Sequence, residues 1–488
     1  MESFQAVASG AAWLAAMQAS NYIVAFFFYF FAARLLSPSE IGSLSLLIAF
    51  ISIYNTVTML ALNNAAIKFI SESVGRGERE AASVVSRRIL KTVLLVDSTA
   101  LFTSVVASPG IASFVHVSIN EVLLAIATAF ILDLTSYYGG VMFGLGLFKQ
   151  VSAQNIVFYW ISRPVAILLM PKGVLGVMEG FLLGSLACLI FSAFVLRGRL
   201  PDPRGDFSLK EVLSFSLPLY LSNIIALAQG WLDVLILSSA AVPAVTGSYY
   251  LVLMGSSILS ILWTPLCSAL LPVLSSSFGR NGSVEVGAPI RIMTFIVLPP
   301  CLSIAAVSRT ALSIVYGGYE EMSLILSMFS ALSILSAYIS LYNVILQAIK
   351  YTKPVFSAGA LSTAIYIALL PILTPSFGSI GAATCRAFLI ATSFLVLHIY
   401  VSRRLKADIK FMGRILLMSA IIALPLLLIE FMVDLPGIIK GACEASAFLL
   451  LWILATRAFR PLSDEDWEIL IRAVPIGRSL LSRIIEHE

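Results

Sequence analysis

The sequence of 488 residues has few charged side chains, and this scarcity excludes an ordinary soluble protein. Asp, Glu, Lys and Arg make up 12% of it, against about 25% in a typical soluble domain. Hydrophobic residues make up 59% and form long continuous runs. A helix crosses a bilayer with about 20 apolar residues, whereas the strands of a membrane barrel alternate apolar and polar residues. We therefore predict an all-α polytopic membrane protein.

Histidine and cysteine are also scarce, with three and five residues, and their spacing suggests neither a metal site nor a disulfide framework. The cysteines stand singly within apolar runs, where a thiol serves as a small packing group. We therefore predict no metal and no cofactor. The first apolar run has no basic segment before it and no cleavage site after it, so we expect it to remain as the first span.

The apolar runs number fourteen when Gly, Pro and charge clusters are taken as breaks, and the second of them covers residues 41–64. Lys and Arg test this number, because they collect in cytoplasmic loops. Of the 31 Lys and Arg residues, 25 follow even-numbered runs, four follow odd-numbered runs and two lie within runs. The pattern predicts a cell-membrane protein with both termini in the cytoplasm. Topology then explains the net charge of +5, and no nucleic-acid partner is expected.

Two stretches of the first half recur in the second half. "SPSEIGSLSLL" (37–47) returns as "AVPAVTGSYYLVL" (241–253), with the same step from Pro through three residues to Gly-Ser, and "MPKGVLG" (170–176) returns as "TPSFGSIG" (374–381). Each pair occupies equivalent places in runs 1–6 and 7–12. Because six crossings return the chain to the same side, two such lobes would be related by an axis along the membrane normal.

The repeat predicts two pseudo-symmetric six-helix lobes with a cleft between them, followed by two C-terminal spans. The predicted divisions are an N-lobe (1–196), a cytoplasmic linker (197–210), a C-lobe (211–402), spans 13 and 14 (403–459) and a cytoplasmic amphipathic tail (460–488). The tail begins with a helix-start pattern and places apolar residues on one face beside arginines, so we expect it on the membrane surface.

Three stretches carry a family resemblance: "AARLLSPSEIGSLSLL" (32–47), "FISESVGRGERE" (69–80) and "AIKYTKPVFSAGALSTAIYIALLPILTPSFGSIGAA" (348–383). They resemble the first outer turn, the basic loop after the second span, and the paired signature of spans ten to twelve in Wzx-type oligosaccharide-lipid flippases. These form the polysaccharide-biosynthesis branch of the MOP superfamily. The branch often carries an Asp-Arg pair in its seventh span, where this chain has Asp233 and Val234.

The resemblance implies two helix bundles around a water-filled cavity that admits the head group of a polyprenyl-diphosphate-linked oligosaccharide. Alternating access would carry that head group from the cytoplasmic to the outer leaflet for the assembly of surface polysaccharide or glycan. Such a flippase makes no covalent bond and is no enzyme. Its expected partners are the lipid-linked oligosaccharide, membrane lipids and a coupling proton or sodium ion, and a monomer would suffice.

Basic residues within apolar runs are candidates for the diphosphate, since each charge costs about 2.5–3.5 kcal/mol at a helix centre. The planar donor fork of Arg suits a phosphate group. Arg163, near the middle of the fifth run, is the first candidate, although it could instead pair with an acidic neighbour. Arg386 in the twelfth run and Arg34 at the outer end of the first are further candidates, and Arg34 could simply reach the interface.

Acidic and amide side chains within the runs are the remaining candidates. Asp97, Asp133 and Asp233 could bind a coupling cation or carry a proton. Asp133 could alternatively form a salt bridge with Arg163 or line a solvated cavity. The last candidates, for sugar hydroxyls or for hydrogen bonds between helices, are Asn155, Asn223 and Gln229.

Two other functions fit the sequence. A cation-coupled multidrug antiporter of the same superfamily would share the two-lobe fold, and the acids within the runs suit it. A membrane glycosyltransferase or polymerase would need reacting groups beside a sizeable domain, and the predicted outer segments are short. We favour the flippase and keep the antiporter as the alternative.

Overall fold

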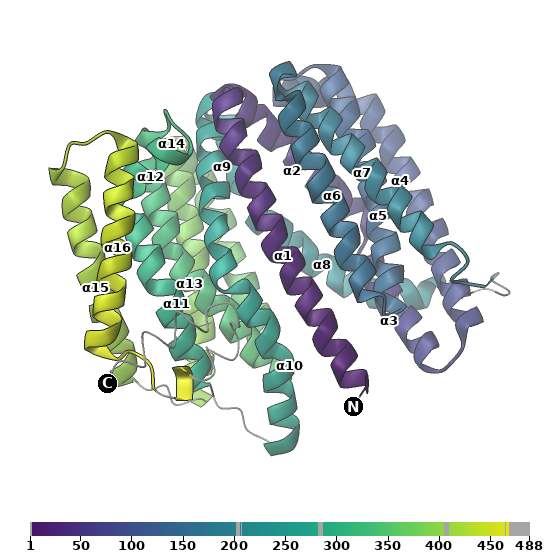
Figure 1. Ribbon diagram of the computed structural model, residues 1–488. Coiled ribbons are helices and arrows are strands. Elements are labelled where there is room, and N and C mark those ends of the chain that lie inside the picture. The colour runs from purple at the N-terminus through teal and green to yellow at the C-terminus, as the bar shows by residue number, and fades with distance from the viewer. Residues whose placement is uncertain are drawn as a thin grey trace. The chain divides into compact units, whose positions relative to one another are not determined.

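The computed structural model describes residues 2–201, 205, 207–281, 286–404, 409–463 and 465–467 (Figure 1). Its regular elements in these ranges are all helices. The chain forms two compact units, the first made of Met1–Leu251 with Leu370–Ser379 and the second of Val252–Leu369 with Ile380–Glu488. The lobe boundaries expected from the repeat stay predictions.

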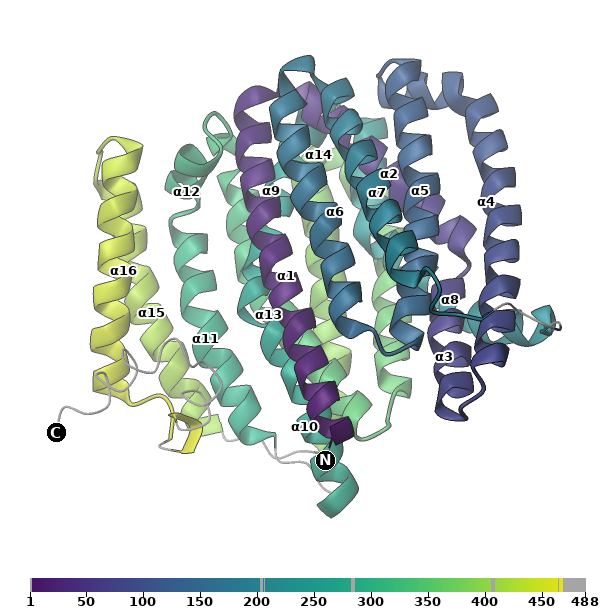
Figure 2. The same cartoon turned by 45° about the vertical axis from the view of Figure 1, so that its right-hand side comes forward.

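The first unit is built from eight long helices and the beginning of a ninth. They are α1 (Glu2–Leu35), α2 (Pro38–Met59), α3 (Leu62–Gly75), α4 (Arg79–Val115), α5 (Ile119–Gly144), α6 (Phe148–Leu169), α7 (Val174–Leu196), α8 (Leu209–Ala240) and α9 (Pro243–Ser257). A short 3-10 helix, η1 (Met170–Lys172), joins α6 to α7. Figure 2 shows α5, α6 and α7 side by side, with α4 beside α5.

The second unit holds the remaining helices, except that Leu370–Ser379 of α14 belongs to the first unit. They are η2 (Ile258–Leu262), α10 (Thr264–Asn281), α11 (Gly287–Ala306), α12 (Ser308–Val315), η3 (Glu320–Met322), α13 (Ser323–Ala348), α14 (Lys353–Arg404), α15 (Ile409–Met432) and α16 (Gly437–Phe459). Gly378, with φ 58° and ψ −133°, breaks α14 into two helices. Gly adopts such a backbone without steric cost, which explains why this residue stands at the kink.

Twelve helices among the described residues are long and apolar enough to cross a membrane. One of them, Lys353–Arg403, contains the two helices on either side of Gly378, and the apolar part of α1 (Ser20–Leu35) is not among the twelve. With these two taken into account, the spans match the predicted fourteen. The predicted all-α polytopic membrane fold is confirmed.

One predicted span is interrupted. The second apolar run was expected to form a single helix over 41–64, but α2 and α3 are separated by Leu60 and Ala61, which both adopt the left-handed conformation. Residues with a side chain rarely do so, and no Gly or Pro marks the break in the sequence. The break brings α3 against α5, where a Cβ on Gly140 would lie 2.8 Å from the Asn63 carbonyl oxygen.

The two copies of the Pro-to-Gly step meet at the starts of α2 and α9. A Cβ on Gly42 would lie 2.1 Å from the carbonyl oxygen of Pro243, and a Cβ on Gly247 would lie 1.9 Å from that of Pro38. Within a bilayer the hydrophobic effect does not drive helices together, because lipid tails are as apolar as the side chains. Small residues let helix backbones approach closely, and van der Waals packing then stabilises their association. Each copy therefore needs its glycine because the other copy's proline carbonyl fills the space.

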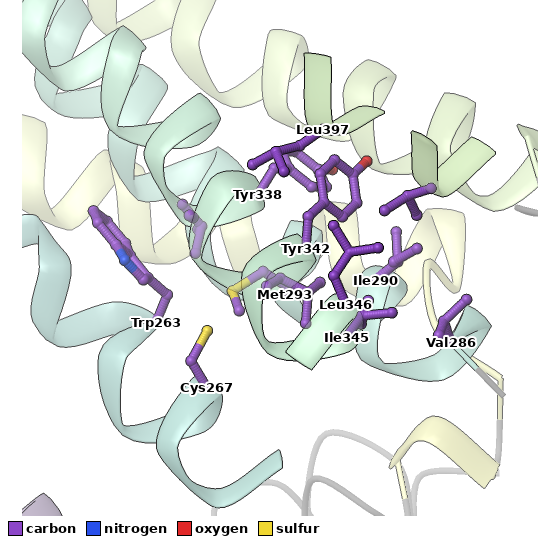
Figure 3. Packing of buried hydrophobic residues seen from close by; sticks show 14 of the residues in the cluster. Trp263, Cys267, Val286, Ile290, Met293, Tyr338, Tyr342, Ile345, Leu346 and Leu397 are labelled. Carbon is purple, nitrogen blue, oxygen red and sulfur yellow. The ribbon is translucent and has the colours of Figure 1, made fainter. Parts of the chain in front are cut away.

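A cluster of buried side chains from α10, α11, α13 and α14 forms the main core of the second unit (Figure 3). Met293 of α11 is 1% exposed there, and Tyr338 of α13 shares a hydrogen bond with Thr294 at 2.5 Å. A second cluster joins α11 to α15 and α16. The last two spans thus pack directly on the core of the second unit.

The segment after α16 is fixed to α11 by an ion pair. Arg291 donates from Nε and Nη2 to the two carboxylate oxygens of Asp466, at 2.7 and 2.9 Å, and Trp467 packs edge-on against Phe295. Asp466 is fully buried. Burial alone would raise the pKa of Asp466, but hydrogen bonds from Arg291 and Ser463 outweigh it and hold the pKa below its usual 3.8. Residues 464 and 468–488 of the predicted tail lie outside the described residues.

Candidate functional site

A polar cavity of about 520 Å³ lies within the first unit. Its wall comes from α2, α3, α5, α6, α7 and α8, with Ala61 from the break between α2 and α3. The side chains with polar groups or aromatic rings in this wall are Asn55, Thr56, Asn63, Asp133, Thr135, Ser136, Phe143, Gln154, Asn155, Phe158, Tyr159, Cys188 and Asn223. Amides and hydroxyls dominate this set, so the cavity offers hydrogen bonds to a hydrated solute.

Asp133 of α5 is held in the wall by two donors from α2. Asn55 Nδ2 donates to one carboxylate oxygen at 2.6 Å, and the hydroxyl of Thr58 donates to the other. Asp133 is 1% exposed. The salt bridge to Arg163 considered from the sequence is not formed, because α2 supplies both partners of this carboxylate.

Asp97 of α4 lies on the other side of the same stretch of α2. Tyr54, the neighbour of Asn55, donates its hydroxyl to Asp97 Oδ1 at 2.7 Å. The other oxygen, Oδ2, is buried without a hydrogen-bond partner. Asp97 and Asp133 interact electrostatically, although only Asp133 lines the cavity. Consecutive residues of α2 therefore connect two of the three predicted acids.

Gln154 of α6 is a buried anchor at the cavity wall. Its Nε2 donates to the carbonyl oxygen of Thr135 at 2.7 Å and to the hydroxyl of Ser192 at 2.9 Å. A Cβ on Gly139 would lie 2.9 Å from Gln154 Oε1, so this glycine makes room for the amide. Gln154 thereby ties α6 to α5 and α7.

Arg163 of α6 lies one turn beyond Tyr159, which lines the cavity. Its guanidinium carbon stands 4.6 Å from the ring centroids of both Phe28 and Phe181 and 5.5 Å from that of Tyr159. Its Nε and Nη1 atoms are buried and have no hydrogen-bond partner in the structure. Aromatic faces thus stabilise the cation while these two donors stay unsatisfied.

An aromatic pair joins the neighbourhood of Arg163 to α8 and α9. The hydroxyls of Tyr29 and Tyr250 hydrogen-bond at 3.0 Å, and both interact electrostatically with Arg163. Trp231 stacks on Tyr250 at 5.8 Å between ring centroids. The next residue, Tyr249, donates to Asp233 Oδ2 at 2.5 Å, so the third predicted acid is buried beside this pair.

Two of the three predicted amides line the cavity. Asn155 and Asn223 line the cavity, and Asn155 Nδ2 donates to the Val151 carbonyl oxygen at 3.0 Å. Gln229 is half-buried on α8 and is not among the lining residues.

The other two predicted arginines lie elsewhere. Arg34 is exposed and lies 3.7 Å over the ring of Phe30. Arg386 is half-buried on α14 in the second unit.

Three polar residues in or behind the cavity wall were missed by the sequence analysis. Asn55 and Thr58 hold Asp133, and Gln154 fixes three helices, yet none of them is charged. The signal available was polar side chains one turn apart inside an apolar run, as Asn55 and Thr58 are in α2. Within the described residues, no group of three His, Cys, Asp or Glu side chains is placed to hold a metal ion.

The polysaccharide biosynthesis protein family matches residues 7–278, more than half of the chain. The chain belongs to this family. The predicted assignment to the polysaccharide-biosynthesis branch of the MOP superfamily is therefore confirmed.

One relative of this chain, similar over most of its length, is the "Probable low-salt glycan biosynthesis flippase Agl15" of Haloferax volcanii. It is 21% identical over 456 residues, which cover 91% of this chain and 94% of the relative.

Solved structures share the fold. The inward closed conformation of the lipid II flippase MurJ aligns with a TM-score of 0.73 and 16% identity, over 90% of this chain and 97% of that one. An inward-facing multidrug resistance MATE transporter of the MOP superfamily aligns with a TM-score of 0.62 and 16% identity, over 79% and 95%. At such identities the likeness concerns the fold, and the function has to be argued from the cavity.

Proposed function

We propose that this protein is a flippase that moves a polyprenyl-diphosphate-linked oligosaccharide from the cytoplasmic to the outer leaflet of the cell membrane. Membership of the polysaccharide biosynthesis family and the likeness to Agl15 support transport for glycan assembly. The head group would occupy the cavity of the first unit while its lipid tail stays in the bilayer. Both termini would face the cytoplasm.

The unsatisfied donors of Arg163 are the observation that carries this proposal. A buried polar group without a partner costs about 1–3 kcal/mol, and more for a charged group. A diphosphate would meet Nε and Nη1 with charge-assisted hydrogen bonds, which are about twice as strong as neutral ones. The aromatic faces of Phe28 and Phe181 hold the guanidinium without using its donors. Arg163 therefore has two N–H groups available to bind an anion.

The composition of the wall fits a sugar. Asn155 and Asn223 reach the cavity from α6 and α8, and Tyr159 offers a ring beside them. Sugar hydroxyls both donate and accept hydrogen bonds, as amides do. The protein needs no catalytic group for this task, since translocation changes no covalent bond.

Transport by the purified protein tests the proposal. Liposomes would contain a polyprenyl-diphosphate sugar with a fluorescent head group, and its loss of accessibility to an impermeant quencher would be followed. We expect Arg163→Ala to slow transfer roughly 10- to 150-fold, the loss expected from charged hydrogen bonds worth about 1.5–3 kcal/mol. The control, Arg197→Ala, removes an exposed arginine after α7 and should transfer at the wild-type rate.

Two results would argue against it. Equal transfer by wild type and Arg163→Ala would remove Arg163 from the diphosphate site. No transfer of any lipid-linked sugar by the wild type would remove the flippase function itself.

A cation-coupled antiporter is the second candidate function, and Asp133 is the observation that favours it. This buried carboxyl group lines the cavity of the first unit, where it would be the acidic partner of an organic cation. Export of organic cations driven by a proton or sodium gradient, and lost in Asp133→Asn while lipid transfer is absent, would select this function. Lipid transfer that persists in Asp133→Asn would argue against it.

A further inference from the structure

A second buried polar cluster lies in the other unit, where α12, α15 and α16 pack together. Glu430 of α15 accepts from the backbone N–H of Thr310 at 3.1 Å on Oε1 and from the Thr310 hydroxyl at 2.6 Å on Oε2. Lys440 places its Nζ 3.2 Å from Glu430 Oε2 and donates to the Glu430 carbonyl oxygen at 2.6 Å. Three donor groups, two from Thr310 and one from Lys440, thus contact this carboxylate.

Glu444 of α16 completes the cluster with a second carboxyl group. Its side chain is 3% exposed and interacts electrostatically with that of Glu430. Its Oε1 is buried and has no hydrogen-bond partner. Because like charges repel strongly away from water, two neighbouring buried carboxyl groups do not both ionise.

The donors around Glu430 decide which group carries the proton. A backbone N–H and an ammonium can only donate, and they point at different oxygens of Glu430. Glu430 therefore holds the negative charge that balances Lys440, and Glu444 is the group that keeps the proton. A second ionised carboxylate here would be buried without its own cation, which costs several kcal/mol.

A cavity of about 310 Å³ adjoins Glu444. Its wall is otherwise largely apolar, from α11, α12, α15 and α16, but it includes Ser303, whose hydroxyl is also buried without a hydrogen-bond partner. Ser303 Oγ and Glu444 Oε1 are thus two unsatisfied polar atoms at the wall of one cavity.

We propose that Glu444 and the adjoining cavity form a proton-binding site that is occupied at neutral pH. The charged groups facing it are Glu430 from α15 and Lys440 from α16, while α11 and α12 present the hydroxyls of Ser303 and Thr310. Arg309, next to Thr310, is exposed. Release of the proton would leave two carboxylates around one ammonium and push α12, α15 and α16 apart. This proton site does not depend on which substrate the protein transports.

Infrared difference spectra of the purified protein in liposomes test the site. Wild type minus Glu444→Gln at neutral pH should contain the C=O stretch of a protonated carboxylic acid. The matched control is Glu179→Gln, which removes a carboxylate ion-paired to Lys172 at 2.9 Å and should change only carboxylate bands. A difference spectrum for Glu444→Gln that contains carboxylate bands and no acid band would overturn the proposal.

Folding of the variants is checked by thermal unfolding against pH. The amide of Glu444→Gln is uncharged and has nearly the same shape as the protonated acid, so this variant should fold. Wild type should lose stability as alkaline pH removes the proton, and Glu444→Gln should lack that loss. Identical pH profiles would contradict the site.

A third variant keeps the proposal testable if Glu444→Gln does not fold. In Glu430→Gln, Lys440 becomes the counter-ion of Glu444, so the acid band should vanish although Glu444 is intact. Persistence of the band in Glu430→Gln would show that the proton does not belong to this pair.

Discussion

Arg163 and Arg291 are both largely withdrawn from solvent, yet they are satisfied in opposite ways. Arg291 forms two hydrogen bonds to the carboxylate of Asp466, so its charge is balanced within the fold. Arg163 has aromatic rings around it and two nitrogens with no hydrogen-bond partner. A paired arginine stabilises the fold, whereas an arginine with unsatisfied N–H donors is available to bind an anion. This difference separates a structural from a functional charge, and it can be tested at both residues.

Removing Arg291 should have the largest effect on stability. Arg291→Ala leaves Asp466 buried and unpaired, which should cost about 3 kcal/mol and loosen the segment after α16. Thermal unfolding in detergent and limited proteolysis of the C-terminus measure this. Lys172→Ala breaks the more exposed pair with Glu179 and should cost at most about 1 kcal/mol. A loss for Arg291→Ala no greater than that of the control would make the buried pair unimportant.

Low pH should weaken the same contact by a smaller amount. Because folding lowers the pKa of Asp466 below 3.8, the stabilisation is complete above the unfolded pKa and is lost as pH falls through the folded pKa. The melting temperature of the wild type should therefore fall more steeply below about pH 4 than that of Asp466→Asn. Parallel curves for the two proteins would rule out this linkage.

Removing Arg163 should have the smallest effect on stability. Arg163→Met gives up cation–π contacts worth about 0.5–2 kcal/mol each but also removes buried donors that cost about 1–3 kcal/mol. We expect a net change within about 1 kcal/mol in thermal unfolding, together with the loss of transfer predicted for Arg163→Ala. A destabilisation as large as that of Arg291→Ala would make Arg163 a structural residue and erase the contrast.

The sequence was sufficient for the fold class because the bilayer imposes it. Continuous apolar runs have to be helices, and the positions of Lys and Arg fix their number. The break at Leu60 and Ala61 could not be foreseen, since neither residue favours the left-handed conformation. The break allows α3 to pack against α5. This is a tertiary contact, which the conformational preferences of the local residues do not predict.

The candidate site could be predicted only in part for a similar reason. The cost of a charge within a span pointed to Arg163 and Asp133, and the amide pattern pointed to Asn155 and Asn223. The identity of each partner depends on how helices rotate against one another. The sequence therefore left a salt bridge between Arg163 and Asp133 open, whereas α2 supplies Asn55 and Thr58 to the acid instead.

The contact between the two Pro-to-Gly steps has the form of an isologous dimer interface. Gly42 meets Pro243 as Gly247 meets Pro38, so each surface recognises its own duplicate. Such reciprocity is expected where two copies of one ancestral chain once paired about a two-fold axis and were later fused. A substitution in either copy then has to be accommodated by the other, and the two steps are bound to evolve together.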